Sequence, residues 1–317
     1  MPSQPADIPR VQMIEIPAEF AGQRLDNFLF TRLKGVPKSR IYRMLRSGEV
    51  RINGSRVRPQ DRVQDGDKLR IPPVRVAERE EIALPTELLR KRLDRRILFE
   101  DDAVLVLNKP VGMPVHGGSG ASFGVIEGLR HLRPEARFLE LVHRLDRETS
   151  GLLLIAKKRS ALRVWHELFR EDRVEKRYLA LLAGAWAHKK LMVDAPLEKN
   201  VAQGGERMVR VSRQGKPAQT DFRRLERFSN ATLVEAAPVT GRTHQIRVHA
   251  AHLGHPIAGD ERYGQEESNR EFRRLGLKRL FLHAAHLVIA HPVSGVEMRL
   301  EAPLEPELEN FLKQLKR

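Results

Sequence analysis

The stretch HRLDRETSGLLLIA, residues 143–156, joins a run of charged residues to an unbroken apolar segment. The segment 152–156 has the length and composition of a buried strand. Thr149, Ser150 and Gly151 before it are typical turn residues. Arg144 and Asp146, two positions apart, face the same side of an extended chain. Two interpretations stay open on spacing alone: a structural salt bridge, or a carboxylate kept ionised as a base or nucleophile on a loop.

From residue 97 onward, short apolar runs alternate with turns. Strands are predicted at Val104–Leu107, Leu152–Ala156, Tyr178–Leu182, Leu233–Ala236, Leu280–Ala290 and Met298–Leu300. Helices are predicted at Ser160–Arg170, Thr243–Leu253 and Pro306–Lys316. Strands outnumber the scattered helices. Residues 97–317 are therefore expected to form an α+β domain with a mixed, largely antiparallel sheet.

The N-terminal part has a different pattern. Residues 1–14 are predicted to be a flexible tail, 15–73 a small α+β module, and 74–96 a linker with a short helix at Glu87–Leu93. In the module, apolar residues follow helical spacing in two short segments, and Gly48 stands where a helix would end. Asn53-Gly54 is a strong signal for a two-residue hairpin turn.

The chain is strongly basic, with a formal net charge of +16. Half of that excess, +8, falls between residues 24 and 71, where thirteen Lys and Arg face five acids. A solvated surface would explain part of this, but a polyanionic partner explains it better. Spread over helices and strands, the arginines do not form the polar face of a membrane-surface helix. The candidate phosphate contacts are Arg24, Lys38, Arg40, Arg43, Arg46 and Arg51.

Several classes of site are excluded or disfavoured. Without cysteine, the chain has no disulfide, thiolate metal site or cysteine nucleophile, which fits a reducing, cytoplasmic setting. No apolar run reaches the length of a membrane span, and residues 1–10 do not form a secretory signal. The glycines at 117–120 and 124 lack a phosphate-loop ending and are read as a flexible loop or a mobile loop over substrate. The histidines at 244, 249, 252, 255, 283 and 286 lack a metal-binding pattern and suggest packing, capping or phosphate contact.

Residues 24–67 resemble an S4 domain, a small RNA-binding module. The resemblance rests on Arg24-Leu25-Asp26, Ser39-Arg40, Gly48-Glu49-Val50, Ile52-Asn53-Gly54 and Gly66-Asp67. It implies that the two helices of the module lie against structured RNA. That expectation suits a basic surface with few aromatic side chains for stacking single-stranded bases.

The larger part resembles the RluA-type pseudouridine synthases, whose signature His-Arg-Leu-Asp-x-x-Thr-Ser-Gly matches residues 143–151. Further family-like segments follow in order, at Lys176–Tyr178, Gly215–Thr220, Thr240–His249, Gly254–Ile257 and Gly259–Gly264. Together they run from about residue 100 to 303. The resemblance implies a pseudouridine synthase fold and the isomerisation of uridine to pseudouridine in RNA without metal or cofactor.

The resemblance also implies roles for single residues. Asp146 matches the catalytic aspartate, as nucleophile or base, and Arg247 the arginine paired with it. Tyr178 matches the tyrosine that stacks on the base and serves as a late base. Arg144 matches the arginine that fills the gap left by the extruded uridine, which costs a few kcal/mol to flip out. The working hypothesis is a monomeric enzyme that acts on 23S ribosomal RNA or its precursor and does not associate with a membrane.

Two alternatives remain at this stage. A non-catalytic RNA-binding or ribosome-assembly protein would tolerate loss of Asp146, Tyr178 or Arg247, and all three are present. A glycosidase would need two carboxylates roughly 5–10 Å apart. Asp146 and Glu148 are the candidates for that pair. Free uracil would be the distinguishing product.

Overall fold

The computed structural model describes residues 10–33, 35–74, 87, 92–117, 123–201 and 207–316. The chain divides into an N-terminal unit, Met1–Ala83, and a C-terminal unit, Leu84–Arg317. The division falls inside the stretch 74–96 that the sequence assigns to a linker. Among the described helices, none combines the length and apolarity that crossing a bilayer requires.

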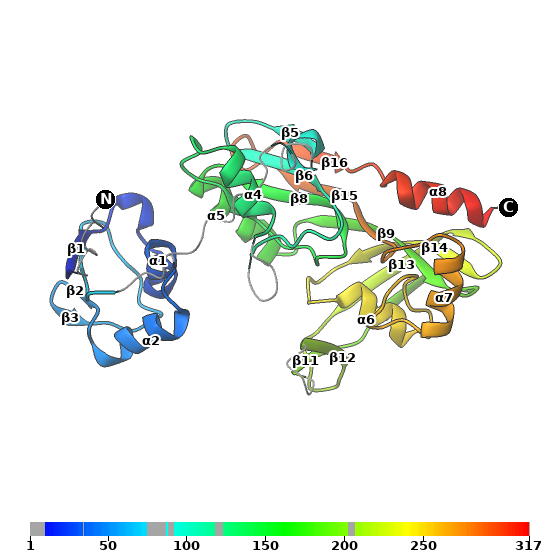
Figure 1. The fold of residues 1–317 in the computed structure, drawn as a ribbon, viewed down its shortest axis with the longest axis horizontal. Coiled ribbons are helices and arrows are strands. Elements are labelled where there is room, and N and C mark those ends of the chain that lie inside the picture. Colours follow the sequence, from blue (N-terminus) through cyan, green and yellow to red (C-terminus); the bar gives the residue numbers. More distant parts are fainter. Residues whose placement is uncertain are drawn as a thin grey trace, which may run out of the picture. The chain divides into compact units, whose positions relative to one another are not determined.

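The N-terminal unit is a four-stranded antiparallel sheet with two helices (Figure 1). Its elements are β1 Gln12–Glu15, a 3-10 turn Ala18–Phe20, α1 Leu25–Arg32, α2 Lys38–Ser47, β2 Arg51–Ile52, β3 Ser55–Arg56 and β4 Lys68–Ile71. The strand order is β1-β4-β2-β3. Apolar side chains of both helices, including Leu29 and Ile41, pack on the sheet residues Leu69 and Ile71 in one core.

Local chemistry explains where these elements end. Gly48 ends α2 in the left-handed conformation, with φ of 73°, which glycine adopts without a steric penalty. Asn53 and Gly54 both have positive φ and connect β2 to β3, as predicted for a hairpin turn. The predicted tail is too long, because Gln12–Glu15 pairs with β4 as an edge strand. The residues of β1 are mostly exposed, so its sequence has no alternation of apolar and polar residues that would predict a strand.

The C-terminal unit is built on one ten-stranded sheet. Its main path runs β10-β13-β14-β9-β15-β8-β6-β5, with β16 beside β15 and β7 beside β8. The strands are β5 Ile97–Glu100, β6 Val104–Lys109, β7 Glu140–Leu141, β8 Ser150–Ala156, β9 Glu175–Ala183, β10 Lys190–Asp194, β13 Gln219–Arg227, β14 Ala231–Pro238, β15 Leu282–Ala290 and β16 Glu297–Glu301. A separate hairpin joins β11 Leu197–Val201 to β12 Arg207–Val211. Only β8 and β15 pair in parallel in the described sheet, which confirms the largely antiparallel fold class.

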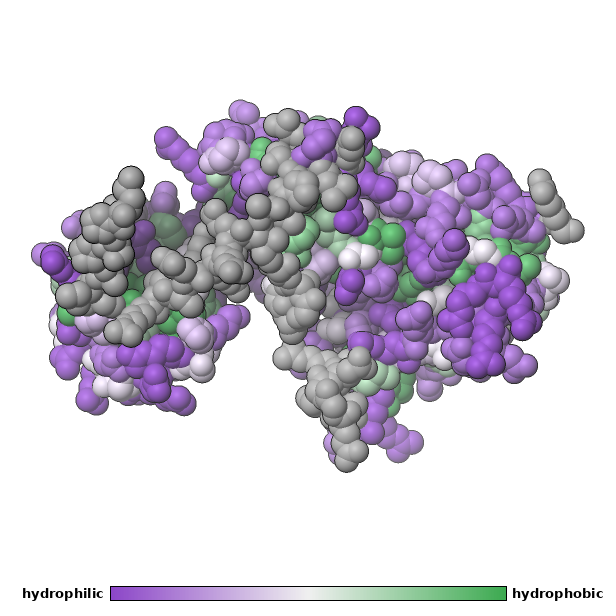
Figure 2. All heavy atoms as spheres, viewed as in Figure 1, coloured by the Kyte–Doolittle hydropathy of each residue, from purple (hydrophilic) through white to green (hydrophobic). Residues whose placement is uncertain are grey.

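Helices cover the two halves of this sheet (Figure 1). They are α4 Val125–Leu132, α5 Arg159–Arg170, α6 Gln245–His252, α7 Glu266–Arg274 and α8 Pro306–Leu315, with a 3-10 turn at Asp94–Arg96. Helix α5 packs on β8, and α6 on β13 and β14. Each half has its own apolar core, and Tyr178 on β9 contacts both. Outside these cores, the face shown in Figure 2 is mainly hydrophilic.

The strands and helices predicted from residue 97 onward are all present, within a few residues of their predicted bounds. The linker is shorter than predicted, because Leu93 is buried in the core and Arg96 forms an ion pair with Glu305. Most of the predicted helix Glu87–Leu93 lies outside the described residues. Strand β13 was not predicted, since five of its nine residues are charged and only Thr220 and Phe222 are buried.

Strand β8 begins earlier than the turn residues suggested. The turn falls at Arg147 and Glu148, and Ser150 and Gly151 already pair with β15. Gly151 has φ of 109°, and a Cβ there would lie 2.2 Å from the carbonyl oxygen of Ala284. The close approach of two backbones therefore requires glycine at this position.

Gly151→Ala is expected to destabilise the C-terminal unit by about 3 kcal/mol, through backbone strain and the clash with β15. Urea denaturation measures this loss. Gly254→Ala is the matched control, because Gly254 also has positive φ but no heavy atom within 4 Å of an added Cβ. An equal decrease in the free energy of unfolding in the two variants would show that the close contact with Ala284 does not cause the destabilisation.

Candidate active site

Asp146 lies on a loop that is docked onto the end of β6. The buried ammonium of Lys109 donates to the carbonyl oxygens of Pro110 and Met113, both at 2.9 Å, and of Arg147 at 3.2 Å. Burial lowers the pKa of Lys109 to about 7, and Arg279 adds to this effect. The three carbonyls satisfy its donors. Lys109 therefore anchors the residue that follows Asp146.

His143 anchors the other end of the same loop. Its Nε2 accepts a hydrogen bond from the Leu154 N–H of β8 at 3.1 Å, and its ring stacks on Phe169 of α5. Burial lowers the pKa of His143 to about 4, with Lys176 adding to the effect, so the ring is neutral at physiological pH. Its role is to hold the loop on the sheet.

Two cavities meet at Asp146. The smaller has a volume of about 130 Å³ and the larger about 940 Å³. They share the residues Arg144, Leu145, Asp146, His244 and Arg247. The larger is within the usual size range of ligand sites and is lined by six arginines and one lysine against four acids. The carboxylate thus stands between a narrow pocket and a wide basic cleft.

Tyr178 and Asp146 line the smaller cavity together. Tyr178 sits in the middle of the sheet, where β9 pairs with both β14 and β15. Burial raises the pKa of its hydroxyl well above the ordinary value, and the charge of Asp146 raises it further. The phenol therefore stays protonated at physiological pH and presents a neutral ring to the pocket.

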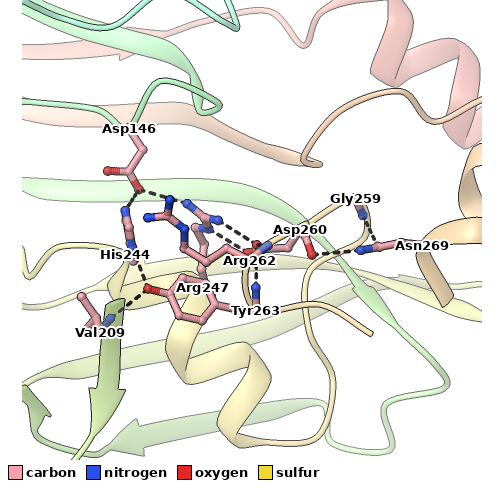
Figure 3. Close-up of polar contacts among 9 residues, drawn as sticks. All are labelled: Asp146, Val209, His244, Arg247, Gly259, Asp260, Arg262, Tyr263 and Asn269. Carbon is pink, nitrogen blue, oxygen red and sulfur yellow. Dashed lines mark hydrogen bonds and ion pairs between the residues drawn. The ribbon is translucent and has the colours of Figure 1, made fainter. Parts of the chain in front are cut away.

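Arg247 of α6 connects Asp146 to a second carboxylate (Figure 3). Its Nη1 lies 3.8 Å from Asp146 Oδ2. Its Nε and Nη2 each donate to Asp260 at 2.7 Å, in a bidentate pair. The guanidinium also lies 5.1 Å from the centre of the Tyr263 ring. These contacts fix the position of a positive charge beside Asp146.

Asp260 is fully buried and is held on every side (Figure 3). Its Oδ1 also accepts the backbone N–H groups of Arg262 and Tyr263, both at 3.0 Å. Asn269 bonds the Asp260 carbonyl and the Gly259 N–H, closing the same turn. Burial alone would raise the pKa of Asp260. The hydrogen bonds and positive charge of Arg247, together with the two backbone N–H groups, lower this pKa below its ordinary value.

The four site residues expected for the larger unit line one connected space. Asp146, Tyr178 and Arg247 border the smaller cavity, and the exposed Arg144 borders both. Spacing suggested Arg144 as the ionic partner of Asp146. The ion pair between Asp146 and an arginine that the described residues show comes from Arg247 instead. This pairing agrees with the family resemblance.

Lys109, His244, Asp260 and Tyr263 were not named as site residues from the sequence. Lys109 and Asp260 are buried ionisable residues, and sequence alone does not reveal their burial. His244 was grouped with the structural histidines, an interpretation that suits His249, which bonds Thr220 and the Ala195 carbonyl. His244 differs, since its Nε2 lies 3.8 Å from Asp146. Within the described residues, no cluster of His, Asp or Glu could hold a metal ion.

The six basic candidates of the N-terminal unit fall into two groups. Four make contacts within the unit. Arg24 pairs with Asp26, Arg40 with Glu49, Lys38 lies over the Phe30 ring and Arg51 donates to backbone carbonyls. The other two, Arg43 and Arg46, are exposed on α2. The glycine-rich segment of the C-terminal unit lies largely outside the described residues.

Comparison with known proteins identifies both units. The RNA pseudouridylate synthase family profile matches residues 103–252, and the S4 domain profile residues 23–69. Among curated relatives, ribosomal large subunit pseudouridine synthase C of Yersinia pestis is 60% identical over 98% of this chain and 97% of its own. The protein of that name from Escherichia coli K12 is 59% identical, over 98% of both chains.

A solved structure agrees with this. Human RNA pseudouridylate synthase domain containing 4 is 31% identical, with a TM-score of 0.61, over 73% of this chain and 97% of its own. All the residues that line the smaller cavity, except Leu282, lie in the part of the chain that the synthase profile matches. This chain belongs to the RNA pseudouridine synthases, and it carries an S4 domain at its N-terminus.

Proposed function

We propose that this protein converts specific uridines of 23S ribosomal RNA, or of its precursor, to pseudouridine, with Asp146 as the catalytic residue. The observation that carries the assignment is the position of Asp146. It stands beside Arg247, shares a small pocket with the Tyr178 ring and opens onto a wide basic cleft. The high identity to large-subunit synthases supports the choice of substrate.

The small pocket is proposed to take the flipped uridine. Breaking the bond between the base and C1′, turning the base and rejoining it through C5 conserves every atom except the C5 hydrogen, which exchanges with water. Asp146 acts at this centre as nucleophile or base. Tyr178 stacks on the uracil ring. Because the pKa of its hydroxyl is raised, Tyr178 stays protonated and is poorly suited to accept a proton. The exposed Arg144 fills the gap in the RNA and offsets part of the cost of flipping.

The basic cleft and the S4 domain are proposed to hold the RNA around that uridine. Phosphate contacts position an RNA strand without reading its sequence. Seven basic side chains line the cleft, and Arg43 and Arg46 extend from α2 of the S4 domain. We propose that the enzyme works as a monomer in the cytoplasm and that its chemistry involves no cofactor.

The proposed reaction is tested with the purified protein and 23S transcripts that carry tritium at C5 of uridine. We expect release of tritium to water, with pseudouridine in the recovered RNA and no free uracil. Free uracil would instead identify a base-excising hydrolase using Asp146 and Glu148. Binding of the transcript without tritium release would support a non-catalytic RNA-binding protein.

Replacing Arg43 and Arg46 by alanine is expected to weaken RNA binding and flatten its dependence on salt. Each phosphate contact contributes ~0.7–0.9 to the slope of log K against log salt concentration, so losing two lowers the slope by about 1.5. Filter binding at several salt concentrations measures the slope. The double lysine variant keeps both charges and is expected to keep the slope. An unchanged slope in the alanine variant would remove α2 from the RNA-binding surface.

A further inference from the structure

A chain of three polar groups links strand β12 to the catalytic carboxylate (Figure 3). The Val209 backbone N–H donates to the Tyr263 hydroxyl at 3.1 Å. That hydroxyl lies 2.7 Å from His244 Nδ1, and His244 Nε2 lies 3.8 Å from Asp146 Oδ2. The proposed reaction as described so far uses neither His244 nor Tyr263.

The chemistry of these contacts selects one tautomer of His244. A neutral imidazole carries one N–H and one lone pair. If Nδ1 carried the proton, the Nε2 lone pair would face the carboxylate of Asp146 and repel it. If Nε2 carries it, that N–H points at Asp146 and the Tyr263 hydroxyl donates to Nδ1. The Val209 N–H already occupies one lone pair of the hydroxyl, which leaves its hydrogen for His244.

The ring is neutral at physiological pH. Burial lowers the pKa of His244; the charge of Asp146 opposes this, but Arg247 and Arg262 reinforce it. A neutral donor next to Arg247 adds a hydrogen bond without a second positive charge. The tautomer, not the protonation state, therefore decides what His244 offers to Asp146.

The backbone of His244 adopts a conformation that is uncommon for residues other than glycine. Its φ of 54° and ψ of 17° place it in the left-handed region just before α6. Glycine adopts this conformation freely, and asparagine, aspartate and histidine adopt it more often than other residues. Gln245 holds the turn, bonding the Thr240 hydroxyl at 2.7 Å and the Arg242 N–H at 3.0 Å. This backbone therefore accepts histidine at 244 but does not require it, and the contacts of the ring carry the argument.

We propose that His244 is a positioning residue that donates from Nε2 to Asp146, with its tautomer set by the Tyr263 hydroxyl. The proposal rests on the function proposed above. Both His244 and Arg247 approach the same oxygen, Oδ2. Together they orient the carboxylate so that Oδ1 faces the uridine. The 3.8 Å separation shortens to a hydrogen bond when substrate fills the pocket, as catalytic contacts commonly do.

The first test reads the tautomer directly, by nitrogen-15 NMR of the histidine rings in the full chain. We expect a protonated Nε2 and an unprotonated Nδ1 for His244, assigned by the loss of its signals in His244→Asn. In Tyr263→Phe the ring under Arg247 remains, but the hydroxyl is gone, and a mixture of tautomers is expected. A protonated Nδ1 in the wild type, or an unchanged tautomer in Tyr263→Phe, would overturn the proposal.

The second test compares two replacements of His244 by single-turnover tritium release. The glutamine amide can reach Asp146 from the Nε2 position, whereas the asparagine amide reaches only toward Tyr263. We expect His244→Gln to stay within about 10-fold of wild type and His244→Asn to lose about 100-fold. A structural role predicts the reverse order, because asparagine suits the left-handed backbone better. Activity of the asparagine variant equal to or above that of the glutamine variant contradicts the proposal.

The outcomes separate this inference from the proposed function. Thermal melts of both variants confirm that they fold. If the wild type releases no tritium from 23S transcripts, the proposed function fails, whatever the tautomer. If the wild type is active while either test above gives its contradicting result, only the role of His244 fails.

Discussion

Asp146→Asn abolishes tritium release from 23S transcripts labelled at C5 of uridine, with an expected loss of at least about 10⁴-fold in the single-turnover rate. Asparagine keeps the size of the side chain. Its amide oxygen can still accept hydrogen bonds from Arg247 and His244. It carries no negative charge and can neither attack a carbon nor remove a proton. The variant therefore separates the chemistry of Asp146 from its place in the fold.

Two controls belong with this variant. RNA affinity is expected to stay within about threefold of wild type, because phosphate contacts elsewhere dominate binding. Glu148→Gln, two residues away on the exposed side of the loop, is expected to stay active. Turnover by Asp146→Asn at near the wild-type rate would remove Asp146 from the reaction. Loss of activity in both variants would point to a disturbed loop or a paired carboxylate mechanism.

Asp260→Asn is expected to destabilise the C-terminal unit by about 3 kcal/mol and to reduce activity. Asparagine cannot neutralise the Arg247 guanidinium, which is buried and donates two hydrogen bonds to Asp260 at 2.7 Å. An unpaired buried charge is costly. Without the carboxylate of Asp260, the Arg247 guanidinium also loses its fixed position 3.8 Å from Asp146. Urea denaturation measures the first effect and single-turnover tritium release the second.

The pH dependence of this loss has a definite sign. The folded pKa of Asp260 lies below the ordinary 3.8, so its ionised form stabilises the fold at and above that pH. The stability gap between wild type and Asp260→Asn is therefore full at neutral pH and shrinks as pH falls through and below 3.8. Glu266→Gln, an exposed acid paired with Arg270 and Arg273, is the control and is expected to show no measurable loss. A gap that grows in acid would contradict the ion-pair account.

Patterns that lie within one element were readable from the sequence. The apolar run of β8 and the Asn53-Gly54 turn each report their structure locally, and both were placed correctly. Strand β1 was missed because its residues are largely exposed and its identity depends on pairing with β4. Strand β13 was missed because five of its nine residues are charged, which leaves no apolar run to detect.

The active site depends on contacts between segments far apart in the chain, which explains what spacing alone could not supply. Asp146, Tyr178 and Arg247 come from a loop, a central strand and a helix, and the family resemblance rather than periodicity brought them together. Spacing favoured Arg144 as the partner of Asp146, but the folded chain places Arg247 there. The left-handed backbone at His244 had no signal in composition or periodicity.

Pseudouridine mapping in 23S RNA tests the central claim most directly. The RNA would come from cells that lack this protein and from the same cells complemented with wild type or with Asp146→Asn at equal expression. Specific pseudouridines are expected to disappear on deletion, return with the wild type and stay absent with the variant. Pseudouridines that persist without the protein, or that return with Asp146→Asn, would contradict the assignment of 23S uridine isomerisation to this carboxylate.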